Sequence, residues 1–102
     1  ICNLDCLIET HTSLELERAI KIGYPIIGIN NRNINTLDIN EYNTINLVSN
    51  IPKEFTIVAE SGIKTYDQIK QYNDFNIFNF LIGESILKST NINSKIKELK
   101  GE

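Results

Sequence analysis

The chain has 102 residues, 41% of them hydrophobic, with a formal net charge of −3 and a pI near 5.1. This length and composition exclude a disordered chain and allow one domain with a modest core. The acidic balance provides no basic field that would attract nucleic acid. No apolar run approaches the ~20 residues that span a bilayer, and the first residues lack the pattern of a signal peptide. We therefore expect a cytoplasmic protein with neither a nucleic-acid nor a membrane partner.

The first part of the chain predicts a strand, a helix and a second strand. The first strand is expected at residues 4–8. Thr12 and Glu15 have the spacing of a capping box that starts a helix, in which Thr12 bonds forward and Glu15 bonds back. Gly23 is placed to end this helix as its C′ residue. The second strand follows at residues 26–29.

The rest of the chain continues the same alternation. The remaining elements, in chain order, are expected to be a polar loop at residues 31–36, a weak helix at 41–48, a strand at 55–59, a helix at 65–72 that a second capping box starts, a strand at 78–82 and a helix at 93–100. Strands separated by helical crossovers predict an α/β fold with a parallel sheet and right-handed connections. No Gly/Ser linker divides the chain, so residues 1–102 are expected to form one unit.

The two cysteines do not indicate a disulfide framework. Cys2 and Cys6 are four positions apart, which is about 13 Å of rise along an extended strand and too far for a disulfide. Too few other ligands lie near them for a metal site, so buried or half-buried thiols are expected. The first residue is Ile rather than Met, and we expect the chain to be a fragment of something longer.

Two short apolar segments each end abruptly at small residues. They are residues 58–63, Val-Ala-Glu-Ser-Gly-Ile, and residues 80–85, Phe-Leu-Ile-Gly-Glu-Ser. Side by side, two such strand ends would offer backbone N–H groups in a small cup that suits a phosphate monoester. In (β/α)₈ barrels the phosphate site lies in the loops after strands 7 and 8. The order of the two segments therefore predicts a phosphate site.

Polar residues follow each expected strand, and parallel strands bring their carboxyl ends to one edge of a sheet. These residues are Glu9, Asn30 with Arg32, Glu60 with Ser61, and Gly83. Alternation would place Glu9, Asn30, Arg32 and Glu60 around one mouth. Glu9 and Glu60, two strands apart, should lie roughly 10 Å from each other, with room for a small aromatic substrate between them.

Each of these residues also has an ordinary structural interpretation. A glutamate at a strand end is usually a solvated loop charge, and Asn30 and Asn31 could be turn residues. Arg32 could pair with a surface acid, and Ser61-Gly62 could be an ordinary turn. His11, the only histidine, is expected to be structural or solvent-facing rather than an acid or base. The lysines and glutamates of residues 95–102 are expected to form a solvated helix face and nothing more.

The same segments resemble the strand-5 to strand-8 motifs of indole-3-glycerol phosphate synthase. The resemblance is carried by Leu7-Ile8-Glu9-Thr10-His11, Ile27-Gly28-Ile29-Asn30-Asn31-Arg32-Asn33, Ala59-Glu60-Ser61-Gly62-Ile63 and Leu81-Ile82-Gly83-Glu84-Ser85. It covers nearly the whole chain, and the second of these segments is highly specific. The resemblance implies the C-terminal half of a TIM (β/α)₈ barrel, with residues 1–102 as a single partial domain.

The resemblance also implies an activity and residue roles. The family is a carboxy-lyase of tryptophan biosynthesis that converts 1-(2-carboxyphenylamino)-1-deoxyribulose 5-phosphate to indole-3-glycerol phosphate, without a metal or organic cofactor. By resemblance, Glu9 would assist proton transfer, with Asn30 and Glu60 as further catalytic residues. Arg32 would lie near the substrate's carboxylate, and Ser61 would bind substrate. The phosphate cup would be formed by Ser61, Gly62, Gly83 and Glu84.

The family's essential lysines, including the general acid, lie on the first strands of the barrel and have no counterpart here. Activity is therefore expected of a full-length parent, whereas the chain alone is expected to be inactive and to need the missing N-terminal half-barrel or to self-associate. Two alternatives remain open. One is a non-catalytic half-barrel that binds phosphate, and the other is a different phosphate-binding barrel, such as a phosphoribosylanthranilate isomerase, which the Asn30-Asn31-Arg32 run disfavours.

Overall fold

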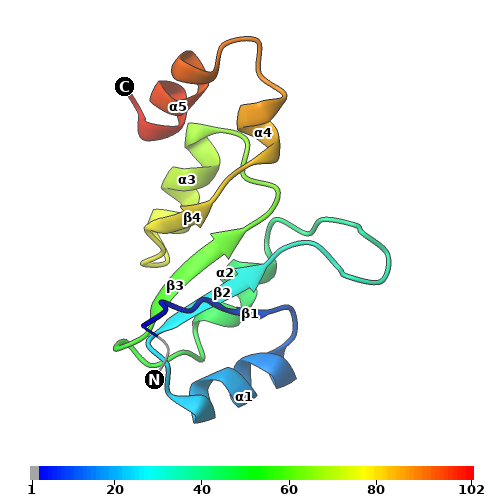
Figure 1. Ribbon diagram of the computed structural model, residues 1–102, viewed down its shortest axis with the longest axis vertical. Coiled ribbons are helices and arrows are strands. Elements are labelled where there is room, and N and C mark those ends of the chain that lie inside the picture. The colour runs from blue at the N-terminus through cyan, green and yellow to red at the C-terminus, as the bar shows by residue number, and fades with distance from the viewer. Residues whose placement is uncertain (1–2) are drawn as a thin grey trace.

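A computed structural model describes residues 3–102, which form a four-stranded parallel sheet with helices between and after the strands (Figure 1). The strands are β1 (Ile8–Thr10), β2 (Ile26–Asn30), β3 (Thr56–Glu60) and β4 (Asn79–Leu81). The helices are α1 (Ser13–Ile22), α2 (Asn43–Val48), α3 (Tyr66–Asn73), α4 (Glu84–Leu87) and α5 (Ile92–Lys100). The strand order is β1-β2-β3-β4, and all neighbours are parallel. The predicted alternation of four parallel strands with helices is confirmed.

The two faces of the sheet carry different kinds of residue. Ile29 and Ala59 are paired in register and fully buried on the face that packs against the helices. The next register pair, Asn30 with Glu60, points to the opposite face because side chains alternate along a strand. The buried core comprises Leu16, Ala19, Ile27, Ile29, Ile57, Ala59, Ile63, Tyr72 and Ile77. One face of the sheet is therefore packed against the helices through apolar side chains. The other face carries polar side chains at the ends of the strands.

Local signals fix the start and end of α1 as predicted. The Thr12 hydroxyl accepts a hydrogen bond from the Glu15 N–H at 3.2 Å, and Gly23 ends the helix with φ +82°. The Glu15 carboxylate bonds back to the N–H of His11 at 2.7 Å rather than to that of Thr12. The second capping box, at the start of α3, has both of its hydrogen bonds.

The predicted first strand is misplaced. The structure has β1 at Ile8–Thr10 instead of residues 4–8, because pairing with β2 begins at the register pair Ile8–Ile27. Residues 4–7 are exposed and lie outside the ladder. The Cys6 thiol is exposed, so the expectation of a buried or half-buried thiol is wrong at this position. Cys2 lies outside the described residues.

The C-terminal region differs in two details from the prediction. A short helix, α4, follows β4 and was not among the expected helices. Helix α5 begins at Ile92, one residue before its predicted start, and buries Leu99, whereas Ile92 and Ile96 are exposed. The longest helix in the described residues, α1, has 10 residues. Within residues 3–102, no helix has the length and apolar character that a membrane crossing needs.

The two edges of the sheet lead to a first prediction. β1 and β4 are edge strands of three residues each, and exposed apolar side chains lie beside them at Leu7, Phe78 and Leu81. Unpaired edges flanked by apolar surface favour association between chains. We therefore expect the 102-residue chain, expressed alone, to self-associate or aggregate at micromolar concentrations. Light scattering coupled to size exclusion measures this, and a monodisperse monomer would contradict it.

Candidate functional site

A cavity of about 830 Å³ lies at the carboxyl ends of β2, β3 and β4. Its size is within the range of small-molecule sites, about 300–1,000 Å³. Six of the eight predicted site residues line it: Asn30, Arg32, Glu60, Ser61, Gly62 and Glu84. The other two predicted residues, Glu9 and Gly83, are not among the lining residues. The strand ends thus bring most of the predicted set to one place.

Glu60 is the buried acid of this cavity. Only 3% of its surface is exposed, and no donor within residues 3–102 reaches its Oε2 atom. The pKa of Glu60 is raised from 4.5 to about 7, chiefly by burial and to a smaller extent by a side-chain hydrogen bond with Glu9 and by the charge of Glu9. That hydrogen bond requires a proton on one of the two carboxyls. Near neutral pH, Glu60 can therefore exist as a neutral acid and donate a proton.

The Glu60 carboxyl reaches over Gly28, which is the register partner of Glu9 on the neighbouring strand. Glu9 is near enough to raise the pKa of Glu60, and the Glu60 carboxyl takes up part of the gap that the sequence predicts between the two strand ends. Gly28, on the intervening strand, makes this possible. A Cβ added to Gly28 would collide with the Glu60 Oε2 and would lie 3.3 Å from Leu7 Cδ1. The missing side chain leaves the space in which the Glu60 carboxyl lies.

The turn after β3 has a backbone that few residues adopt. Ser61 has φ +69° and Gly62 has φ +77°. For Ser61 this left-handed conformation costs about 1–2 kcal/mol. Hydrogen bonds hold the turn in place, because the Asn31 amide donates to the Ser61 carbonyl at 3.0 Å and Gln68 donates to the Gly62 carbonyl at 3.1 Å. A strained turn fixed in this way is typical of a ligand-binding site.

Asn31 has a structural role that the sequence did not reveal. Its side chain is buried, and besides the Ser61 carbonyl it donates to the Tyr72 hydroxyl at 2.9 Å. Its Oδ1 accepts from the Thr44 hydroxyl at 2.8 Å. Asn31 therefore ties the end of β2 to α2, to α3 and to the turn after β3. The sequence offered only a possible turn residue, since these partners are 13 to 41 positions away.

Arg32 lies at the rim of the cavity and is held by α4. Its Nη2 pairs with the Glu84 Oε2 at 3.3 Å, and its Nη1 donates to the Leu37 carbonyl at 3.0 Å. Lys88 binds the other Glu84 oxygen at 2.7 Å. The hydrogen bond and charge of Lys88 hold the pKa of Glu84 below its usual value, with a smaller contribution from Arg32. Arg32 thus pairs with an acid, as one interpretation has it, and also lines the cavity, whereas its role in binding substrate stays a prediction.

Gly83 is the N-cap of α4, with φ −131°. A Cβ added there would meet nothing within 4 Å, so the described residues alone do not require glycine at this position. Its role in a phosphate cup remains a prediction.

Three lysines that sequence reasoning missed line the same cavity: Lys64, Lys88 and Lys95. The Lys95 ammonium donates to the Lys64 carbonyl at 2.6 Å. The expectation that residues 95–102 form only a solvated face is therefore wrong for Lys95, whose side chain is 19% exposed. Lys64 follows the Ser61-Gly62 turn closely in the sequence, and this position could have indicated that Lys64 lies near the cavity. The docking of α5 that brings Lys95 to the site was not readable from the sequence.

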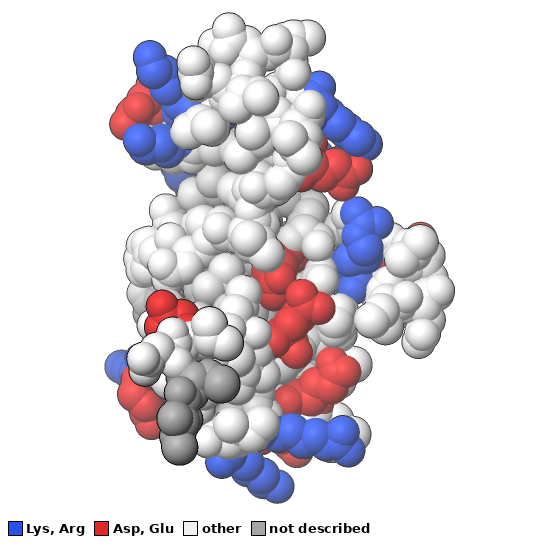
Figure 2. Space-filling view, in the orientation of Figure 1, with Lys and Arg blue, Asp and Glu red and all other residues white. Residues whose placement is uncertain are grey.

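Charges of opposite sign lie side by side on this face of the molecule. Figure 2 shows acidic side chains over the ends of the first strands and basic side chains between them and the projecting loop after β2. Such an arrangement suits a substrate that carries anionic groups and undergoes proton transfer. Among residues 3–102, no group of three His, Cys, Asp or Glu side chains is arranged to hold a metal ion.

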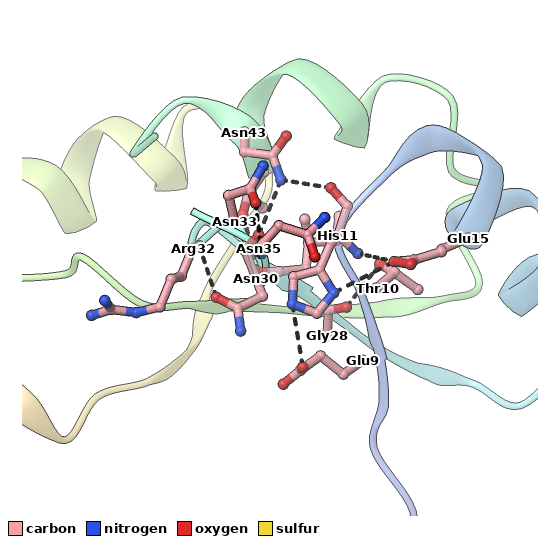
Figure 3. A network of polar contacts seen from close by, with 12 residues as sticks. Glu9, Thr10, His11, Glu15, Gly28, Asn30, Arg32, Asn33, Asn35 and Asn43 are labelled. Carbon is pink, nitrogen blue, oxygen red and sulfur yellow. Dashed lines mark hydrogen bonds and ion pairs between the residues drawn. The ribbon is translucent and has the colours of Figure 1, made fainter. Parts of the chain in front are cut away.

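His11 lies beside this site, between two carboxylates (Figure 3). Its Nε2 is 3.5 Å from the Glu9 Oε2, and its Nδ1 is 3.4 Å from the Glu15 Oε1. Asn43 donates to the His11 carbonyl at 3.1 Å and to the Asn30 carbonyl at 3.0 Å. The imidazole is 16% exposed, so His11 is a half-buried residue rather than a solvent-facing one.

Comparison with known proteins identifies the family. The family model described as indole-3-glycerol phosphate synthase matches residues 1–99, a range that includes all eight predicted site residues. The chain belongs to the indole-3-glycerol phosphate synthase family. The resemblance seen in the sequence is thereby confirmed, and the isomerase alternative is not supported.

Individual relatives agree with this assignment. Indole-3-glycerol phosphate synthase of Acetivibrio thermocellus is 40% identical over 100 residues, covering 98% of this chain and 38% of the relative. The synthase of Lachnoclostridium phytofermentans is 41% identical over 97 residues, covering 95% of this chain and 36% of the relative. The synthase of Endomicrobium trichonymphae is 42% identical over 99 residues, covering 95% of this chain and 38% of the relative. The chain thus spans somewhat over a third of the length of these synthases.

A solved structure shares the fold without close sequence similarity. The crystal structure of the Amycolatopsis orientalis BexX/CysO complex contains a chain that superposes with a TM-score of 0.71 at 10% identity. The superposition covers 93% of this chain and 38% of the other. At this identity the similarity concerns the fold alone.

Proposed function

We propose that this chain supplies the C-terminal half-barrel, and with it half of the active site, of an indole-3-glycerol phosphate synthase. The reaction would convert 1-(2-carboxyphenylamino)-1-deoxyribulose 5-phosphate to indole-3-glycerol phosphate, carbon dioxide and water. The observation that carries the proposal is the convergence of Asn30, Arg32, Glu60 and Ser61 on one cavity at the strand ends. These residue types supply an acid, an amide, a cation and a hydroxyl to a site of small-molecule size.

Glu9 and Glu60 would manage the protons of the reaction. Ring closure and dehydration each need a proton donor and a proton acceptor at fixed positions. The pair provides both, because burial favours the neutral acid at Glu60 while Glu9 is 47% exposed at the strand end. Asn30 accepts from the Arg32 N–H at 2.9 Å and lies in the cavity wall, where it would orient the substrate.

The phosphate of the substrate would lie between the turn after β3 and the start of α4. Ser61, Gly62 and Glu84 line this part of the cavity and Gly83 precedes Glu84 at the start of α4, and their main-chain groups would contact the phosphate. Lys64 and Lys95 line the same cavity and would add positive charge. The Glu84 carboxylate is held by Lys88 and Arg32, which limits its repulsion of an anion.

The partner of this half-site would be the N-terminal half of the barrel. Completing the barrel would cover the open edges of β1 and β4 and the polar face of the sheet. The alternative of a non-catalytic phosphate-binding half-barrel rests on the lysines and the strained turn, which would bind an anion without the rest of the barrel. The two proposals differ in whether turnover occurs once the barrel is complete.

A chimera tests the proposed function. Residues 1–102 would replace the matching C-terminal part of the Acetivibrio thermocellus synthase. We expect the chimera to form indole-3-glycerol phosphate. The fluorescence of this indole product measures the reaction. The same chimera with Glu60→Gln should lose this activity, whereas one with Glu54→Gln, an exposed glutamate before β3, should keep it. A folded chimera without turnover that still binds inorganic phosphate would favour the non-catalytic alternative.

Arg32 gives a separate prediction about binding. For the parent chain, meaning the longest natural chain that carries these residues, Arg32→Ala should raise KM by about 10–100-fold with a smaller change in kcat. The reason is that a cation gripping a carboxylate in both the ground and transition states contributes uniform binding, worth roughly 1.5–3 kcal/mol. Arg18→Ala, on the exposed side of α1, is the matched control. A fall in kcat at constant KM would contradict a binding role.

A further inference from the structure

A buried amide lies directly behind the turn that follows β3. Asn31, the residue after β2, is 2% exposed, and both the donors and the acceptor of its side chain are in use. Its Nδ2 donates to the Ser61 carbonyl at 3.0 Å and to the Tyr72 hydroxyl at 2.9 Å. Its Oδ1 accepts from the N–H of Thr44 at 3.1 Å and from the hydroxyl of Thr44 at 2.8 Å. An amide whose donors and acceptor are all paired has a single orientation.

The partners of Asn31 are themselves held by the core of the molecule. Thr44 belongs to α2 and is fully buried. Tyr72 belongs to α3, is 2% exposed, and donates through its hydroxyl to the Glu41 carbonyl. Two helices therefore fix the Asn31 amide, and the amide in turn fixes the Ser61 carbonyl.

The direction of the Ser61 carbonyl determines where the next N–H points. The peptide between Ser61 and Gly62 is trans, and in a trans peptide the C=O and the N–H point in opposite directions. Since the Ser61 carbonyl faces the buried amide of Asn31, the Gly62 N–H points away from that amide. Gly62 lines the cavity, and no backbone carbonyl within residues 3–102 accepts from its N–H.

A free N–H at such a turn suits an anion. Phosphate oxygens are strong acceptors, and backbone N–H groups in turns with a left-handed residue form concavities that bind them. Lys64 and Lys95 line the same cavity and supply positive charge. Nothing in the proposed function accounts for the buried amide that orients this turn.

We propose that Asn31 is a positioning residue for the phosphate end of the site: it holds the Ser61 carbonyl on the buried side of the turn, so that the Gly62 N–H faces the cavity and donates to an oxygen of a phosphate monoester. Asn31 touches no substrate atom in this scheme, unlike its neighbours Asn30 and Arg32, which line the cavity. The phosphate part of the inference rests on the proposed function, whereas the hold on the turn is independent of it.

Inorganic phosphate is the probe for the first test, titrated into the parent chain by isothermal titration calorimetry. In Asn31→Ala we expect the Kd for phosphate to rise about tenfold or more, which corresponds to the loss of one hydrogen bond to a charged group. Tyr72→Phe is the matched control, because it removes a partner of Asn31 from the same buried network and keeps the bond to the Ser61 carbonyl. It should lose stability and keep the wild-type Kd. No rise in Asn31→Ala, or an equal rise in both variants, would overturn the proposal.

A double-mutant cycle tests the hold on the turn without any ligand. Ser61→Gly should raise the urea midpoint of the parent chain, because glycine adopts the left-handed conformation without steric cost. In an Asn31→Ala background the gain should be smaller, since of the two side-chain hydrogen bonds to the turn only that of Gln68 remains and Ser61 can relax. Asn31→Ser, which removes the amide and keeps a polar group, replaces Asn31→Ala if that variant does not fold. Equal gains in both backgrounds would overturn the proposal.

The kinetic readout separates this role from a general loss of structure. Asn31→Ala should raise KM and change kcat little, because the phosphate does not react and is bound alike in the ground and transition states. A fall in kcat at unchanged KM would overturn the positioning role. A parent chain that lacks lyase activity but binds phosphate through Asn31 would contradict the proposed function and leave this inference standing. Lyase activity with the same KM and phosphate Kd in Asn31→Ala would do the reverse.

Discussion

Replacing Glu9 by glutamine is expected to lower kcat of the parent chain by about 10²–10⁴-fold, the usual range for a general acid or base. Glutamine keeps the size of the side chain but can neither accept a proton nor exchange one with Glu60. Glu9 is 47% exposed at the strand end, so the free energy of unfolding should change little. The measurement is steady-state turnover with indole product fluorescence, accompanied by denaturant unfolding.

The control for this prediction is Glu17→Gln, which removes a carboxylate from the exposed surface of α1. It should retain the wild-type kcat. Near-normal turnover by the Glu9→Gln variant would show that Glu9 is an ordinary solvated charge at a strand end. A variant that loses activity only because it unfolds would be recognised by its denaturation midpoint.

The second large effect concerns stability and pH, and it comes from Glu60. Its pKa is about 7 in the folded chain against 4.5 as the ordinary value. Between these two values the folded state keeps a proton that the unfolded state has lost, so stability falls as the pH rises from about 4.5 to about 7. Below this window both states are protonated. Above it the full cost of a buried charge remains, on the order of 3 kcal/mol.

Glu60→Gln should remove this pH dependence. The variant has no charge to bury, and its amide can donate to the Glu9 carboxylate. We therefore expect it to be more stable than the wild type at pH 8, by up to about 3 kcal/mol, and similar to it near pH 4.5. Urea unfolding of both proteins across this pH range measures the difference. Parallel stability curves for the two proteins would contradict this, because they would show that the pKa of Glu60 is the same in the folded and unfolded states.

Elements encoded by local signals could be predicted from the sequence. The helix start at Thr12, the αL end at Gly23 and the capping box before α3 each depend on residues within four positions of one another. The alternation of apolar residues placed β2 and β3 within one residue. The carboxyl-end rule for parallel sheets predicts that Asn30 and Glu60 lie near one another, and both line the cavity.

Features that depend on distant partners could not be predicted. The start of β1 depends on where pairing with β2 begins, and the hydrogen bonds of Asn31 reach three separate segments. The reach of the Glu60 carboxyl toward Glu9 depends on the missing side chain of Gly28, which lies on the strand between them. Lys95 reaches the cavity only because α5 docks against α3 and α4. Periodicity carries no information on such contacts.

Turnover by the parent chain tests the central claim most directly, namely that these strand ends form half of a carboxy-lyase active site. The purified protein would be given 1-(2-carboxyphenylamino)-1-deoxyribulose 5-phosphate without added metal or cofactor, and carbon dioxide and indole product would be measured together. We predict equal amounts of the two products from the wild type and a loss of both in Glu60→Gln. A folded parent chain that binds the substrate and releases neither product would contradict the account.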